Sequence, residues 1–305
     1  MGMLSAALAL AMATTAAAGD IPMRADATLP GLSQQTATPD TIATQSDVYN
    51  RMTVPISIAG HGSYDFLLDT GAQRSVLASG FAARLGFAAG EPLHVTGLAG
   101  ARSVNTVMLS GMRLGQRNIV DLEVPVFPDD AMDSPGIIGI DSLKDQRVLL
   151  DFRAHRISVE PSAKHKEGDG YEIVVSARRR GGQLILSHAW IDGIDTDIII
   201  DTGADAAIGN LALQRAISHQ TNGQSITLTS VTGQTIPAEI GTARNLRIGR
   251  MQLSNVDIAF VDSPAFVALK LTNRPALLLG MNELRAFGRV AIDFPQHKIL
   301  FDVTS

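Results

Sequence analysis

One short motif occurs twice in this chain, and the repeat constrains the possible fold more than any other feature. In "FLLDTGAQ" (residues 66–73) and in "IIIDTGAD" (residues 198–205), an aspartate follows three apolar residues and precedes Thr-Gly-Ala. Moving a carboxylate out of water without a partner is costly or forces it to bind a proton. Asp69 and Asp201 therefore each need a partner, and each is the candidate partner of the other.

The parallels continue after both motifs, in the same order. "HVTGLAG" (residues 94–100) corresponds to "SVTGQTI" (230–236), and "MRLG" (112–115) to "LRIG" (246–249). Further on, "IIGIDSLKDQRVLLDF" (137–152) corresponds to "LLGMNELRAFGRVAIDF" (278–294). Matching motifs in one order are what an internal duplication leaves in a sequence. We therefore expect two lobes with the same plan, related by a pseudo-two-fold axis.

Each copy begins with a predicted β-hairpin that ends at its aspartate. The first alternates apolar and polar residues before a turn at residues 59–62 and returns to Asp69; the second turns at residues 192–193 and returns to Asp201. Helical patterns occur only in short stretches, at residues 80–86, at residues 211–219 and directly after Gly139 and Gly280. The sequence therefore predicts an all-β fold class, mainly β with a few short helices.

The chain divides into five predicted segments. They are a signal peptide (residues 1–18), a flexible N-terminal extension (19–50), an N-terminal lobe (51–160), a linker (161–170) and a C-terminal lobe (171–305). The linker is polar and contains glycine, as is typical of a surface connection. With 305 residues, 45% of them hydrophobic, the chain is long enough to bury a core in each lobe.

The first residues predict secretion. A short apolar run ends in small residues that fit an A-x-A cleavage site, so we expect a cut after Ala18 and a secreted or periplasmic protein. No Lys or Arg precedes the run, and a flexible alanine-rich tail is the alternative. The extension that follows has the composition of a linker, with a removable pro-segment as its alternative.

Composition excludes several function classes. A formal charge of -5 leaves no excess of basic residues to neutralise phosphates, so nucleic acid is not an expected partner. Without cysteine, the chain has no disulfides, thiolate metal sites or cysteine nucleophiles. The seven histidines show no H-E-x-x-H spacing, so we expect no metal. No G-x-S-x-G motif occurs, so a serine hydrolase of the α/β type is not expected either, and we expect no cofactor. After the signal peptide no apolar segment is long enough to span a membrane.

Two facing carboxyl groups suit one particular chemistry. If the lobes pack with their Asp-Thr-Gly turns opposed, Asp69 and Asp201 come within hydrogen-bonding distance and share one proton, because two like charges so close do not both ionise. One carboxyl group then serves as base and the other as acid toward a water held between them. Such a pair hydrolyses an amide without a nucleophile, a metal or a cofactor.

The residues beside the aspartates fit this task. Gly71 and Gly203 allow close backbone approach and supply N–H donors toward the acids. Thr70 and Thr202 can hydrogen-bond across the interface and hold the two turns together. We expect these four residues to support the dyad.

These motifs resemble the retropepsin-like aspartic proteases. Asp-Thr-Gly-Ala after an apolar strand, a glycine-bearing hairpin further on and an apolar-apolar-Gly motif before a short helix all occur twice, from about Arg51 to the C-terminus. The tails are more similar to the cellular and bacterial members than to the viral enzymes, which usually have Arg after that last Gly, where this chain has Ile140 and Met281. The resemblance implies a two-lobed fold, a catalytic dyad of Asp69 and Asp201 and flaps that close over an extended peptide.

The flaps implied by the resemblance fall on two segments. They comprise Gly97, Leu98, Ala99 and Gly100 in the first copy and Val231, Thr232 and Gly233, up to Gln234, in the second. The first has the glycine content of a mobile hairpin tip, whereas the second has a single glycine. Ordinary β-turns at the edge of each lobe are the alternative.

The two copies differ after Thr-Gly-Ala. Gln73 stands in one and Asp205 in the other, so the cleft should contact its substrate unequally on its two sides. Asp205 cannot pair with the viral-type arginine, and its partner is either a backbone N–H or basic side chain of the peptide, or its own turn. Ala72 and Ala204 offer no hydroxyl to the ionised carboxylates, so the dyad should keep its proton to higher pH than pepsin does.

The sequence as a whole predicts an aspartic endopeptidase. We expect a monomer that hydrolyses an extended peptide or protein substrate through a water activated by Asp69 and Asp201. The alternative is a peptide-binding module that has the same cleft and does not cleave.

Overall fold

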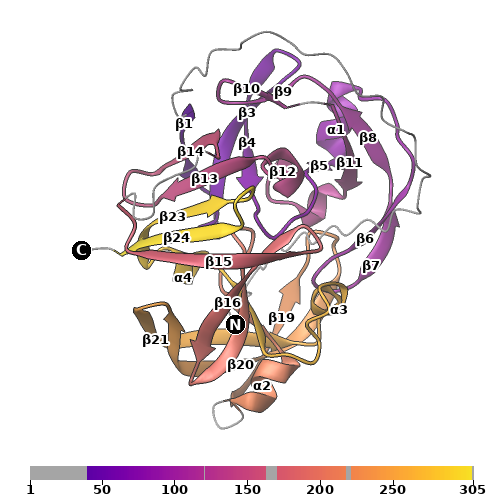
Figure 1. Ribbon diagram of the computed structural model, residues 1–305. Coiled ribbons are helices and arrows are strands. Elements are labelled where there is room, and N and C mark those ends of the chain that lie inside the picture. The colour runs from indigo at the N-terminus through magenta and orange to yellow at the C-terminus, as the bar shows by residue number, and fades with distance from the viewer. Residues whose placement is uncertain (1–39, 120, 163–169, 218–220, 304–305) are drawn as a thin grey trace, which may run out of the picture.

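The computed structural model describes residues 40–303 apart from 120, 163–169 and 218–220 (Figure 1). These residues are mostly strands with a few short helices, which confirms the predicted all-β fold class. The predicted signal peptide, the extension up to residue 39 and most of the predicted linker lie outside the described residues.

The N-terminal lobe is built on a nine-stranded sheet. Its strands are, in spatial order, β10 (Arg117–Ile119), β9 (Met112–Leu114), β3 (Met52–Ile58), β4 (His61–Leu68), β12 (Gly136–Ile138), β5 (Val76–Ala78), β11 (Leu122–Phe127) and β8 (Thr106–Leu109), with β2 (Gln45–Ser46) paired to β3. A separate hairpin consists of β6 (Leu93–Thr96) and β7 (Ala101–Val104). The predicted hairpin before Asp69 is β3 and β4.

The C-terminal lobe repeats this plan within a larger sheet of thirteen strands. Its own strands follow the order β16 (Gln183–Ile191), β17 (Ile194–Ile200), β22 (Ala276–Leu279), β18 (Ala207–Asn210), β21 (Met251–Val261), β20 (Thr235–Ile248) and β19 (Thr221–Thr229). In both lobes the strand that leads to the aspartate pairs in parallel with the strand before the later glycine, as β4 with β12 and β17 with β22. The same connections recur because the same motifs recur.

The remaining strands of the large sheet join the lobes, as Figure 1 shows between the purple and orange halves. Their order is β1 (Asp40–Ala43), β14 (Arg156–Pro161), β13 (Gln146–Asp151), β23 (Phe287–Asp293), β24 (Lys298–Val303) and β15 (Ile173–Arg180). At the centre the two copies of one motif pair with each other antiparallel, with Val148 opposite Ile292 and Leu150 opposite Val290. A motif that pairs with its own copy in this way lies on a local two-fold axis.

The strand β1 lies within the segment predicted to be a flexible extension. It pairs with β14 on one edge of the joining strands, as β15 pairs with β24 on the other. Only Ile42 of its four residues is buried, so the segment shows no apolar alternation that would predict a strand. The segment forms a strand because it pairs with β14.

Short helices stand where the pattern placed them. They are α1 (Ser79–Leu85), α2 (Leu211–Ala216), the 3-10 turn η2 (Ile140–Ser142) and α4 (Met281–Leu284). Two further short helices were not predicted, the 3-10 helix η1 (Asp129–Ala131) and α3 (Pro264–Ala268), because elements this short show no helical period. The largest buried apolar cluster draws on both lobes, including Leu68 and Leu150 from one and Ile200 and Val290 from the other.

Candidate active site

Asp69 and Asp201 lie at the ends of β4 and β17, where the strands of the two lobes meet. Neither side chain is exposed to solvent. The backbone N–H of Asp69 donates to the Ile138 oxygen and that of Asp201 to the Leu279 oxygen, both at 3.0 Å. Each aspartate is therefore fixed by the strand that precedes the later glycine of its own lobe.

The threonines of the two turns bind each other across the seam. The backbone N–H of Thr70 donates to Thr202 Oγ1 at 3.0 Å, and that of Thr202 donates to Thr70 Oγ1 at 3.2 Å. Thr70 Oγ1 in turn donates to the Ile200 oxygen at 2.8 Å, and Thr202 Oγ1 to the Leu68 oxygen at 2.6 Å. These four hydrogen bonds join the turns in the way predicted for the two threonines.

Each carboxylate is held on its own turn through one oxygen. Asp69 Oδ1 accepts from the N–H groups of Gly71 and Ala72 at 2.8 and 2.9 Å. Asp201 Oδ1 accepts from the equivalent N–H groups of Gly203 and Ala204 at 3.0 and 3.2 Å. The glycines thus supply the donors that the sequence predicted.

The two carboxyl groups interact directly. Burial raises the pKa of Asp201 well above its usual range, repulsion by Asp69 raises it further, and a hydrogen bond between the two side chains acts in the same direction. Gly203 shows how close the turns are, because a Cβ at this position would overlap the Asp69 carboxylate. The pair therefore favours a state in which one carboxyl group keeps its proton.

The predicted flap tips are both hairpin turns, and each crosses to the opposite lobe. Leu98, at the tip between β6 and β7, is fully buried in an apolar cluster of the C-terminal lobe that includes Ala204. Val231, at the tip between β19 and β20, is 2% exposed in a cluster of the N-terminal lobe that includes Ala72. The tips therefore cover the two Asp-Thr-Gly-Ala turns in a reciprocal way.

Polar contacts hold the first tip in place. Gly97 N–H donates to the Gly100 oxygen at 2.7 Å and closes the turn. Ser263 Oγ donates to the Leu98 oxygen at 2.6 Å, and Arg102 Nη1 donates to the oxygen of Thr232, at the other tip, at 2.9 Å. Thr232 is itself fully buried, with Gly233 beside it in the turn and Ala99 half-buried in the first. The structure thus brings the predicted flap residues together above the dyad.

Asp205 lies apart from the two catalytic candidates. Its carboxyl group is bonded by the N–H of Ala206, in its own turn, and burial raises its pKa to about 6. Arg51, 1% exposed, lowers that pKa through its charge, although its own ion pairs are with Asp47 at 2.6 Å and Asp133 at 3.0 Å. An arginine from the other lobe thus acts on Asp205 where the viral-type arginine is absent.

Two residues at the seam escaped the sequence analysis. Gln183 is 1% exposed, and its Nε2 donates to the Gly71 oxygen at 2.6 Å, so it ties the first turn to the start of β16. The second residue is Arg51. In the sequence, Gln183 and Arg51 are recognisable only as polar residues at the start of an apolar strand, and many exposed residues at strand ends look the same.

Among the described residues no helix is long and apolar enough to cross a membrane. That same part of the chain contains no group of three or more His, Cys, Asp or Glu side chains arranged to hold a metal ion.

Among known proteins, a family model matches this chain and no individual curated protein does. A family model described as aspartyl protease matches it twice, over residues 54–142 and 187–282. The two matches together cover more than half of the chain, and each contains one of the two Asp-Thr-Gly-Ala motifs. The chain, with its retropepsin-like motifs in both halves, therefore belongs to the aspartyl protease family.

Proposed function

We propose that the chain is an aspartic endopeptidase in which Asp69 and Asp201 activate a water for attack on a peptide bond. The observation that carries the proposal is the direct pairing of two buried carboxyl groups, fixed by the reciprocal hydrogen bonds of Thr70 and Thr202. Membership of the aspartyl protease family supports it.

The pair supplies both an acid and a base. The ionised carboxylate takes a proton from the water while the water oxygen bonds to the carbonyl carbon, and the protonated carboxyl group gives its proton to the carbonyl oxygen. When the tetrahedral species collapses, the C–N bond breaks and the amine takes the proton from the carboxyl group that had deprotonated the water. The other carboxylate takes a proton from a hydroxyl of the tetrahedral species, so the pair again holds one proton. Asp69 and Asp201 suit this cycle because burial and mutual repulsion keep one of them protonated.

An extended peptide is the substrate that this site fits, and the flap tips must move to admit it. Leu98 and Val231 are buried over the two turns in the structure described above. Because each tip crosses to the other lobe, the opening of each flap exposes the apolar cluster that its tip covers. Those clusters then offer apolar surface to the side chains of the peptide.

Comparison of the wild type with Asp69→Asn and Asp201→Asn tests the proposal. A denatured protein mixture is incubated with each protein, with and without a statine-type inhibitor, and the cuts are mapped by mass spectrometry. We expect cuts by the wild type that both variants and the inhibitor abolish. If the wild type makes no cut that the variants fail to make, the chain is a peptide-binding module that does not cleave.

The dyad should work at higher pH than that of pepsin. The raised pKa of Asp201 means that the single shared proton persists as pH rises, since Ala72 and Ala204 add only backbone donors to the ionised form. We expect a pH profile of cleavage with its maximum above pepsin's. A maximum below about pH 3 would contradict this.

We further propose export of the protein with removal of residues 1–18, as a secreted or periplasmic monomer. N-terminal sequencing of the protein recovered from its producing cell tests the cut after Ala18. An unprocessed N-terminus in the mature protein would show that the apolar run is a tail.

A further inference from the structure

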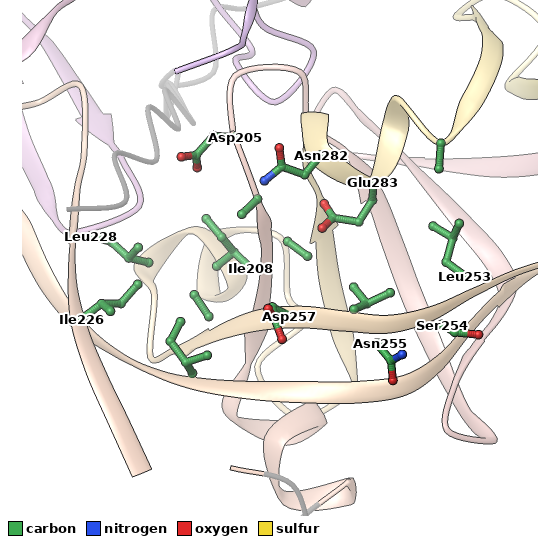
Figure 2. Close-up of a pocket in the computed structure, with 16 residues that line it drawn as sticks. Asp205, Ile208, Ile226, Leu228, Leu253, Ser254, Asn255, Asp257, Asn282 and Glu283 are labelled. Carbon is green, nitrogen blue, oxygen red and sulfur yellow. The ribbon is translucent and has the colours of Figure 1, made fainter. Parts of the chain in front are cut away.

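A pocket of about 420 Å³ opens in the C-terminal lobe at the loop that follows Asp201 (Figure 2). It lies between the loop after β17, the strands β18 to β21 and the helix α4. Apolar side chains form much of its wall, including Ile208, Ile226 and Leu228. The loop reaches the pocket four residues after Asp201, and β19 leads from it directly to the second flap tip. A peptide under that flap would therefore pass the pocket.

Three carboxylates line this apolar pocket, and none of its lining residues is basic. Glu283 reaches from α4 into the space that faces β21 (Figure 2). Its Oε2 is buried and has no hydrogen-bond partner in the part of the chain that the structure describes. Burial, with repulsion by Asp205 and Asp257, raises the pKa of Glu283 to about 7. A buried carboxylate oxygen without a donor calls for a cation or a donor from outside the chain.

The duplication allows this pocket to be compared with the same place in the other lobe. In the N-terminal lobe the N–H groups of Ile140 and Asp141 donate to the oxygens of Ala72 and Gln73. In the C-terminal lobe the same two bonds run from Met281 and Asn282 to Ala204 and Asp205. The bonds fix the equivalence of the two copies residue by residue, so that Arg74 corresponds to Ala206 and Ser142 to Glu283.

The strand across the pocket follows the same equivalence. Val126 lies opposite Leu77 in the N-terminal lobe, and Phe260 lies opposite Gly209 in the C-terminal lobe. Counting back three residues along both strands makes Glu123 the counterpart of Asp257.

The N-terminal lobe places an arginine in the equivalent space. Arg74 Nη1 donates to the backbone oxygen of Glu123 at 3.1 Å. Burial raises the pKa of Asp141, and the charge of Arg74 opposes that rise. Asp141 also accepts from Ser75, through its N–H at 2.9 Å and its Oγ at 2.7 Å. The carboxylate of Glu123 accepts from the N–H of Glu91 and from Thr106 Oγ1, so both acids of this lobe have donors within the chain.

The C-terminal lobe lacks these donors and has acids at two positions where the other lobe has none. Ala206 and Ala207 stand where the other lobe has Arg74 and Ser75, and both line the pocket. Asp205 and Glu283 stand where it has Gln73 and Ser142. The space that an arginine side chain occupies in one lobe is therefore open in the other, where Asp205, Asp257 and Glu283 line it.

We propose that this pocket binds the basic side chain of a peptide substrate, an arginine above all, in the place that Arg74 takes in the N-terminal lobe. Apolar walls pack against the methylene stem, and Glu283 and Asp205 receive the charged head. The inference rests on the proposed function in one respect, that the bound molecule is a peptide lying across the dyad. We expect the basic residue at one fixed position on one side of the bond that is cut.

Binding without cleavage tests the pocket. The Asp69→Asn chain is titrated with short alanine- and leucine-based peptides that carry a single arginine, moved one position at a time, and with the same peptides carrying neutral citrulline. We expect one arginine position to bind at least about tenfold more tightly than its citrulline match, as a charge-assisted hydrogen bond implies. Equal affinities at every position would overturn the proposal.

Three further substitutions, each added to Asp69→Asn, locate the effect. Ala206→Arg fills the pocket as Arg74 fills its counterpart, and Glu283→Gln keeps the shape while it removes the charge; each should abolish the preference for arginine over citrulline. Glu239→Gln removes an equal charge from an exposed side chain of β20 outside the pocket and should leave the preference intact. A preference that survives Ala206→Arg would place the cation elsewhere and refute the assignment.

The two proposals fail separately. If the wild type cleaves with no preference for a basic residue near the cut, the pocket assignment is wrong and the proposed function stands. If it cleaves nothing while arginine peptides still bind more tightly than citrulline peptides, the endopeptidase proposal is wrong and the pocket assignment stands.

Discussion

Thr70 and Thr202 show how much of this site rests on single hydroxyl groups. Each hydroxyl accepts from the opposite turn and donates to a backbone oxygen of the opposite lobe. Both residues are buried, so water does not replace a lost bond. The position of the two carboxyl groups therefore depends on these hydroxyls, although neither belongs to the dyad.

Thr202→Val removes one hydroxyl at nearly constant shape. The Leu68 oxygen and the Thr70 N–H then lose their partner, and we expect the free energy of unfolding to fall by about 2–4 kcal/mol. Urea denaturation measures it. Thr202→Ser keeps the hydroxyl and serves as the control, with a smaller loss. A loss in Thr202→Val no larger than that in Thr202→Ser would contradict the role of the hydroxyl.

Glu283 should make stability depend on pH. Its pKa rises from 4.5 to about 7 on folding, chiefly through burial, so the folded chain binds the proton more tightly than the unfolded chain. The wild type should therefore lose more stability than Glu283→Gln between about pH 4.5 and pH 7, since both proteins share the loss that the raised pKa of Asp205 causes. We expect the variant to be more stable by about 1–3 kcal/mol at pH 8 and to equal the wild type near pH 4. Thermal unfolding across this range, with Glu239→Gln as control, measures the difference.

At the scale of elements, the two flaps are built differently. The first is the isolated hairpin of β6 and β7, whereas the second continues into β20, which also pairs with β21 and β16. The first has few strand neighbours to hold it, so its buried tip at Leu98 carries more of its attachment. We therefore expect the first flap to open more readily than the second.

Leu98→Ala tests this difference. Truncation of a buried leucine costs about 2–5 kcal/mol, and here the loss falls on the closed position of the hairpin. We expect faster amide hydrogen exchange over residues 93–104, measured by mass spectrometry, and no change over β13. Met108→Ala, at a side chain that is 41% exposed on β8, is the matched control. Unchanged exchange in the hairpin would show that the tip does not hold it.

The elements that the sequence could predict are those in which local pattern and repeat agree. The hairpins before Asp69 and Asp201 alternate clearly and occur twice, and the threonine bonds followed from the motif. The strand β1 could not be predicted, because three of its four side chains are not buried. The role of Gln183 was equally hidden, since the bond to Gly71 depends on how the lobes dock. The pocket had a signal, because alignment of the two copies places Ala206 opposite Arg74.

At the scale of the whole molecule, the lobes are not independent bodies. The strands β13 and β23 join them through a continuous antiparallel ladder, and the largest apolar cluster includes residues of both lobes. The dyad lies at the same seam. Folding of the site and docking of the lobes are thus one event.

Unfolding should therefore be a single transition. Trp190, the one tryptophan of the chain, lies on β16 and reports on the C-terminal lobe by its fluorescence, whereas far-UV circular dichroism reports on all strands. We expect the two probes to give the same midpoint in urea, as in two-state unfolding. A circular dichroism transition that precedes the fluorescence change would show that the N-terminal lobe unfolds alone.

The N-terminal lobe has Arg74 where the C-terminal lobe has Ala206, and this difference between the lobes is possible only because both belong to one chain. In an assembly of two identical subunits every substitution appears on both sides of the axis, and a peptide fits equally well in either orientation. Here one side keeps its internal arginine while the other presents an open, acidic recess. A peptide that places a basic residue there is threaded in one sense only, with its amino and carboxyl termini assigned to particular lobes.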